Sequence, residues 1–136
     1  MAIQICELLD FSEKLLTLNS ECAWRSAISR SYYAAYHRAL LWEQEEHIDG
    51  MNVGQAGGVH QQLFNRLRNP SAALPAELRR RSMHLGTKLQ VQKERRATAD
   101  YRLMRDIPLS EAQLQVTQAR QVVEIHCAPS RRASEV

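Results

Sequence analysis

One segment, from about Glu21 to Ile48, most constrains the fold of this chain. It contains no glycine or proline, and when it is drawn as a helix, apolar and aromatic residues cover most of its circumference. A helix that is apolar on nearly all sides is stable in water only when other elements surround it. The sequence therefore predicts one long central helix, which becomes plainly polar only over residues 43–47.

The rest of the chain predicts four more helices around this one. Apolar spacing and helix-end signals place them at about Gln4 to Leu18, Val59 to Arg68, Pro75 to Thr98, and from Ser110 onward through Val123. Short connections favour antiparallel neighbours. The expected fold is therefore all-α, a single antiparallel bundle of about five helices over residues 1–128. Residues 129–136 are expected to form a polar, disordered tail.

Composition excludes several classes of protein. The chain has 136 residues, a net charge of +3 and 44% hydrophobic residues, which fits one ordinary globular domain. No apolar run approaches membrane-spanning length and no signal segment precedes the first helix, so we expect a cytoplasmic protein with no membrane partner. The three cysteines are widely spaced and form no CxxC, which argues against a disulfide or a zinc site. No cofactor or metal is expected.

The central segment carries a polar stripe that suits chemistry. Arg30 and His37 lie seven positions apart, which brings them within about 20° of each other around a helix. Tyr33 falls between them, one turn from each. Histidine can move a proton near neutral pH, and arginine can hold a phosphate whose charge grows in a transition state. Arg30 and His37 are therefore the candidate catalytic pair.

Spacing alone is weak evidence, because two other arginine–histidine pairs have similar spacing. Arg79 and His84 fall about 140° apart around a helix, and Arg120 and His126 about 120° apart. Only the pair in the central segment shares a helix face. In a helix buried on most sides, that pair also fits a structural role in which both side chains hydrogen-bond to neighbouring helices. Both interpretations stay open.

Two further groups are candidate binding residues. His60 opens a helix after two glycines, where a histidine suits either a site or ordinary packing. Arg96, Asp100 and Tyr101 lie together at the end of a later helix. Asp100 can accept a bond from Arg96, and Tyr101 can anchor the turn, so a structural role fits these residues as well as a binding role.

Taken in order, these residues resemble the HEPN domain family of prokaryotes. The resemblance rests on residues 29–37 (SRSYYAAYH), on Val59-His60 after a glycine-bearing loop, and on Arg96 followed by Ala99-Asp100-Tyr101. It spans about residues 4–126 and implies an antiparallel helical bundle that commonly forms a homodimer. Some members are metal-independent ribonucleases, often toxins, whose arginine–histidine pairs meet across the dimer interface. Others are non-catalytic and bind RNA or nucleotides.

The resemblance also implies a partner, because many HEPN proteins are encoded beside a small nucleotidyltransferase (MNT) that acts as partner or antitoxin. In the nuclease class the arginine–histidine motif usually sits in a later helix, often with a small polar residue after the arginine. Here the pair that shares a face lies in the second helix, and Arg79 is followed by Arg80. Whether the chain is an enzyme is therefore left open.

Three functional hypotheses follow. The first is a component of a toxin–antitoxin or defence system that acts on RNA, in which Arg30 binds phosphate, His37 is the acid/base and Tyr33 orients or stacks. The second is a non-catalytic module that pairs with an MNT-type nucleotidyltransferase and presents a surface of Arg30, Tyr33, His60 and Arg96 to a nucleotide or to that partner. The third is a small dimeric protein in which the arginines and tyrosines only build the core.

Overall fold

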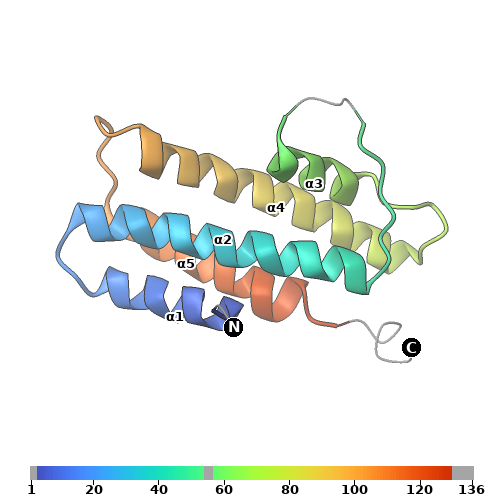
Figure 1. Cartoon of the computed structure of the whole chain (residues 1–136), viewed down its shortest axis with the longest axis horizontal. Coiled ribbons are helices and arrows are strands. Elements are labelled where there is room, and N and C mark those ends of the chain that lie inside the picture. The colour runs from blue at the N-terminus through green and yellow to red at the C-terminus, as the bar shows by residue number, and fades with distance from the viewer. Residues whose placement is uncertain (1–2, 54–56, 130–136) are drawn as a thin grey trace.

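Five α-helices make up the computed structural model, which describes residues 3–53 and 57–129 (Figure 1). They are α1 (Ile5–Leu16), α2 (Glu21–Glu45), α3 (Val59–Arg68), α4 (Ala76–Tyr101) and α5 (Leu109–Gln121), and α5 continues into a π-helical turn, Val122–His126. No strand occurs among the described residues. The predicted all-α bundle of about five helices is confirmed. The predicted tail at 129–136 lies, apart from its first residue, outside the described residues.

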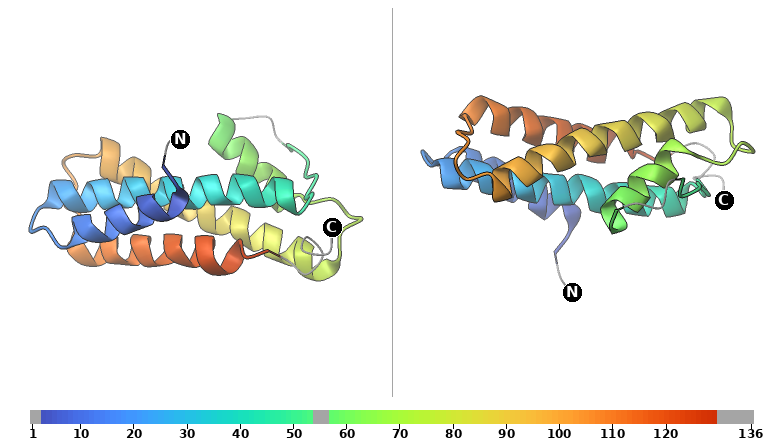
Figure 2. Two further views of the ribbon diagram at one scale, coloured as in Figure 1. Left: turned by 60° about the horizontal axis from the view of Figure 1, so that its bottom comes forward. Right: turned by 90° about the horizontal axis from the view of Figure 1, so that it is seen from above.

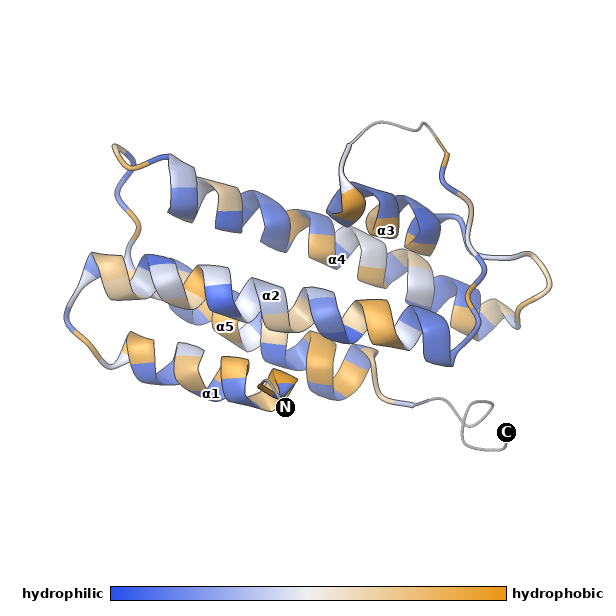
Figure 3. Ribbon diagram, in the orientation of Figure 1, coloured by the Kyte–Doolittle hydropathy of each residue, from blue (hydrophilic) through white to orange (hydrophobic). Residues whose placement is uncertain are grey.

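The four longer helices run alternately in opposite directions, and α3 is a short helix inserted between α2 and α4 (Figures 1 and 2). α2 packs against α1, α4 and α5, while α3 packs mainly on α4. The predicted central position of α2 is thereby confirmed. Much of α4 consists of hydrophilic residues (Figure 3), although its Leu85 and Leu89 are fully buried in the same core cluster as Tyr32 and Trp42 of α2.

α2 ends at Glu45, three residues before the predicted end at Ile48. His47 and Asp49 have positive φ angles of 52° and 48°, which a right-handed helix does not allow. Ile48 is fully buried, and its carbonyl oxygen accepts a hydrogen bond from the backbone N–H of Ser71 at 3.1 Å. The helix therefore gives way to a turn before Ile48, and the Ile48 carbonyl bonds to a distant turn instead.

The C-terminal end of α4, which extends three residues beyond the prediction, is held by a buried arginine of α2. Arg25 Nη1 donates to the carbonyl oxygens of Ala99 at 2.9 Å and Arg102 at 3.2 Å, and Nη2 donates to that of Arg105. Arg25 Nε pairs with Glu21 at 3.0 Å. The last carbonyls of a helix have no partner within it, so this guanidinium supplies the missing donors.

We expect Arg25→Met to lower the free energy of unfolding by about 2–4 kcal/mol, because several carbonyl oxygens lose their charged donor. Arg30→Met is the matched control on the same helix. The Arg30 side chain is exposed, so its loss should change the free energy of unfolding by less than about 0.5 kcal/mol. Urea denaturation followed by circular dichroism measures both values, and equal losses in the two variants would contradict the capping role.

Gly50 is required by a close approach of two backbones. A Cβ atom there would stand 1.9 Å from the carbonyl oxygen of Arg66 in α3. We therefore expect Gly50→Ala to lower the free energy of unfolding by about 1–3 kcal/mol. Gly58→Ala is the control, since a Cβ at Gly58 meets nothing within 4 Å, so that only the N-cap preference for glycine over alanine is lost and the cost should be smaller, about 0.5–1 kcal/mol. Thermal and urea unfolding would reveal the difference, and a neutral Gly50→Ala would disprove it.

Candidate functional site

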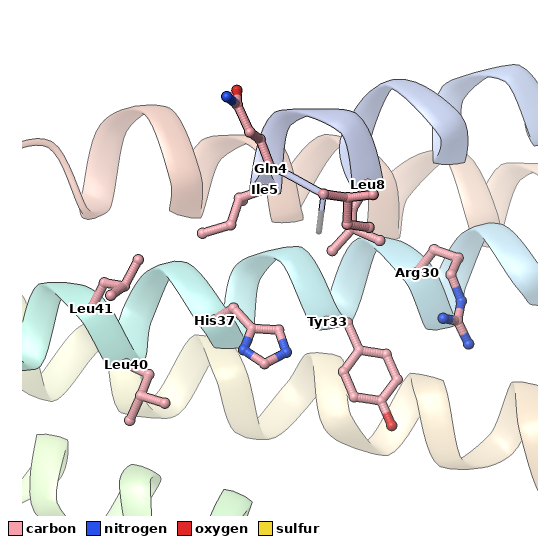
Figure 4. Close-up of a pocket in the computed structure, with 9 residues that line it drawn as sticks. Gln4, Ile5, Leu8, Arg30, Tyr33, His37, Leu40 and Leu41 are labelled. Atoms are coloured by element: carbon pink, nitrogen blue, oxygen red, sulfur yellow. The ribbon is translucent and has the colours of Figure 1, made fainter. Parts of the chain in front are cut away.

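The solvent-exposed side of α2 is a narrow stripe on an otherwise buried helix. Arg30 and His37 are exposed and Tyr33 between them is half-buried, whereas most of the residues around them on α2 are buried. Figure 4 shows the three side chains in a row along α2. Neither Arg30 nor His37 makes a hydrogen bond or an ion pair with any described residue. The interpretation that both serve only as internal hydrogen-bonding groups therefore loses its support.

Tyr33 links the two candidate catalytic residues. The Arg30 Cζ atom lies 5.4 Å from the centroid of the Tyr33 ring, a cation–π contact. The His37 ring stacks on the same phenol, with centroids 6.2 Å apart and an interplanar angle of 23°. These contacts fix the row without using the N–H groups of the guanidinium, so its donors stay available to a ligand such as phosphate.

The end of α4 brings its three predicted residues to the same place. Arg96 Nη2 donates to the Tyr33 hydroxyl at 2.9 Å, and Arg96 Cζ lies 5.3 Å from the centroid of that ring. Arg96 Nε lies 2.9 Å from Asp100 Oδ2, an ion pair whose N–H is not aligned for a hydrogen bond. Ser29 Oγ donates to the same carboxylate oxygen at 3.2 Å. Arg96 also lies 5.6 Å from the centroid of the largely exposed Tyr101 ring.

His60, in the first turn of α3, contacts three tyrosines of α2. Its Nδ1 atom and the Tyr32 hydroxyl are 2.6 Å apart, so these two groups share a hydrogen bond. Its ring stacks on Tyr36 at 3.9 Å between centroids and meets Tyr33 edge-on at 6.1 Å. Burial raises the pKa of Tyr32 far above its ordinary value, so this phenol keeps its proton.

The surroundings of His60 favour the neutral imidazole. Burial is the largest cause that lowers its pKa below the ordinary value of 6.5, and the positive charges of Arg96, Lys93 and His37 lower it further. A histidine in this state carries no charge at pH 7 and can accept a proton.

All seven predicted site residues therefore lie in one network of contacts, although they come from three helices. The members are Arg30, Tyr33 and His37 of α2, His60 of α3, and Arg96, Asp100 and Tyr101 of α4. The roles assigned to them stay predictions. The partners Tyr32, Tyr36 and Ser29 are not predicted from the sequence as part of the site.

A groove of about 590 Å³ lies beside the stripe, between α2 and the start of α1 (Figure 4). Arg30, Tyr33 and His37 line one part of it, and the remaining lining is mostly apolar: Ile3, Gln4, Ile5, Leu8, Leu40 and Leu41. None of these remaining lining residues is predicted from the sequence as part of a site. The sequence does contain a signal that Leu41 belongs to this surface: Leu41 follows His37 by four residues and so continues the exposed stripe of α2.

The alternative pair, Arg120 at the end of α5 and His126 in the π-helical turn that follows, is not available for such a site. Arg120 is held by three carboxylates, with its nitrogens 3.2 Å from Asp10, 2.8 Å from Glu13 and 2.8 Å from Glu124. A guanidinium that is already neutralised in this way has little left to offer a phosphate. Arg30 is thus preferred over Arg120 as a phosphate-binding candidate both by its angular position relative to a histidine around the helix and by its lack of carboxylate partners.

We expect the stability of the fold to fall as the pH falls below about 6.5, in part because of His60. Its pKa is lower in the folded chain than in the unfolded chain, so the unfolded chain takes up the proton first and is favoured as the pH drops through this range. His60→Gln should flatten the curve of unfolding free energy against pH. Burial also lowers the pKa of His126, so this residue contributes another part of the pH dependence. His126→Gln is therefore the comparison variant. Urea denaturation at pH 7.5 and 5.5 measures the effect, and an unchanged slope in His60→Gln would refute it.

Among the described residues no helix is long and apolar enough to cross a membrane, and no group of three or more metal-ligating side chains is placed to hold a metal ion. Comparison of the chain with models of protein families, with curated proteins and with solved structures found no match.

Proposed function

We propose that this protein is a HEPN-like ribonuclease that works without a metal ion, as a component of a toxin–antitoxin or defence system. One observation carries the proposal: Arg30 and His37 flank Tyr33 on an exposed stripe beside a groove, and neither has a hydrogen-bond or ion-pair partner among the described residues. A cation and an imidazole that are exposed and unpaired in this way suit a phosphate ligand and a proton transfer.

The reaction would be the transfer of a phosphodiester within the RNA strand. His37 takes the proton of a ribose 2′-hydroxyl as that oxygen attacks the neighbouring phosphorus, and Arg30 binds the non-bridging oxygens on which charge grows. The bond from phosphorus to the 5′-oxygen breaks, and that oxygen leaves with a proton from water or from a protonated histidine. The products are a 2′,3′-cyclic phosphate and a 5′-hydroxyl. Tyr33, which contacts both Arg30 and His37, would orient the two side chains.

The largely apolar groove favours a second candidate function, a non-catalytic module that binds a protein partner. Ile3 and Leu41 are 60% and 45% exposed at its edge, and exposed apolar surface of this kind commonly marks a contact with another protein. In this function the partner is an MNT-type nucleotidyltransferase, with Arg30 and the residues around Arg96 facing a nucleotide. A homodimer formed along α2 belongs to the first proposal, because it would bring two copies of the stripe together.

The wild-type protein should cleave single-stranded RNA in the presence of EDTA and leave 2′,3′-cyclic phosphate ends. His37→Ala should lower the rate by at least about 100-fold, the usual contribution of a general acid or base, while circular dichroism shows an intact fold. His84→Ala is the matched control, because His84 is an exposed histidine on α4 outside the site, and its rate should stay unchanged.

Equal rates for wild type and His37→Ala would exclude His37 as the proton-transfer group. Wild-type protein that leaves RNA intact, yet co-purifies from its host with a nucleotidyltransferase, would favour the second function over the first.

A further inference from the structure

The face of α4 that carries Arg96 also carries Lys93, a residue without a role so far. Lys93 and Arg96 are three residues apart, so they share a helix face. The Lys93 ammonium lies 5.9 Å from the centroid of the buried Phe64 ring in α3. Phe64 follows His60 by four residues, which places His60 one turn away on the same side of α3. Lys93 therefore lies where α3 and α4 meet, beside His60.

Positive charge gathers at this place with little to offset it. Two cationic side chains, Arg96 and Lys93, lower the pKa of the His60 imidazole by their positive charge. Lys93 makes no hydrogen bond or ion pair with any described residue, while Arg96 is paired with Asp100. The imidazole also contacts the phenol rings of Tyr32, Tyr33 and Tyr36, none of which is a carboxylate that could offset the positive charge. Cations held close together repel one another, so an anion bound among them would relieve that repulsion.

We propose that His60, Lys93 and Arg96 form a second phosphate-binding position, separate from the one at Arg30 and His37. The position rests on the proposed function and adds to it the class of ligand: a strand with at least two successive phosphates, not a nucleoside monophosphate. The guanidinium carbons of Arg30 and Arg96 lie 5.4 and 5.3 Å from the centroid of the same Tyr33 ring. Two phosphates bound to them would be close enough to belong to neighbouring nucleotides.

Lys93→Gln tests the second position, and Lys88→Gln is the matched control. Lys88 is exposed on the same helix, five residues earlier and about 140° around it. Lys88→Gln therefore removes the same charge from a different face of α4. Binding of a fluorescent single-stranded RNA decamer is measured by anisotropy at several salt concentrations, in a His37→Ala background that keeps the RNA intact. Lys93→Gln should weaken binding by about threefold to tenfold and reduce the salt slope by about 0.7 to 1. Lys88→Gln should change neither.

Two further measurements sharpen the test. Lys93→Gln should weaken binding of the dinucleotide pApA but leave binding of adenosine monophosphate, which needs only one position, close to that of the control. Without any RNA, NMR titration should show a higher His60 pKa in Lys93→Gln than in Lys88→Gln, because a positive charge that lowers this pKa is gone.

Each outcome decides between the two proposals. If the protein carrying only the His37→Ala change binds no RNA, the proposed function and the second position both fall. If that protein binds RNA and Lys93→Gln behaves as Lys88→Gln does, the second position alone is overturned. An unchanged His60 pKa in Lys93→Gln would also overturn it, since Lys93 would then not face the imidazole.

Discussion

The burial of α2 on three sides is the constraint on which the rest of this structure depends. α1, α4 and α5 pack around it, so its small and aromatic residues are enclosed and only one stripe reaches solvent. Because that stripe is narrow, the few polar residues on it are brought together by the helix itself. Arg30 and His37 are thus positioned by the packing of their buried neighbours rather than by hydrogen bonds of their own, whereas Tyr33 also accepts a hydrogen bond from Arg96.

Helix periodicity was sufficient to predict the all-α bundle, the central place of α2 and the shared face of Arg30 and His37. It was not sufficient to show that α3 and α4 place His60 and Arg96 beside that face. Tyr32 and His60 are 28 positions apart in the sequence, and Tyr33 and Arg96 are 63 positions apart, so these contacts depend on the tertiary packing. The end of α2 shows the same limit. Ile48 continues the apolar pattern of the helix, yet it lies beyond the helix end, buried and hydrogen-bonded to Ser71 far along the chain.

Arg25 illustrates a role that no local pattern predicts. It is one of the 15 arginines in the sequence and lies near the start of α2. Nothing in the local sequence indicates that its side chain contacts the end of α4. Its function as a cap arises because antiparallel packing brings the beginning of α2 to the end of α4, where unpaired carbonyl oxygens gather. Arg30, five residues later, has the same chemistry and points into solvent. Burial, not residue type, separates the structural Arg25 from the exposed Arg30, the candidate binding residue.

The three tyrosines of residues 29–37 both hold the helices together and contact the residues of the candidate site. Tyr32 shares a hydrogen bond with His60, Tyr33 accepts one from Arg96, and Tyr36 stacks on His60, so together they tie α3 and α4 to α2. The same contacts orient the imidazole and the guanidinium that line the site. Removing a tyrosine would therefore alter packing and site geometry at once, and would not distinguish a structural role from a functional one. The exposed residues Arg30 and His37 have few internal contacts, so their substitution reports on function with the least disturbance of the fold.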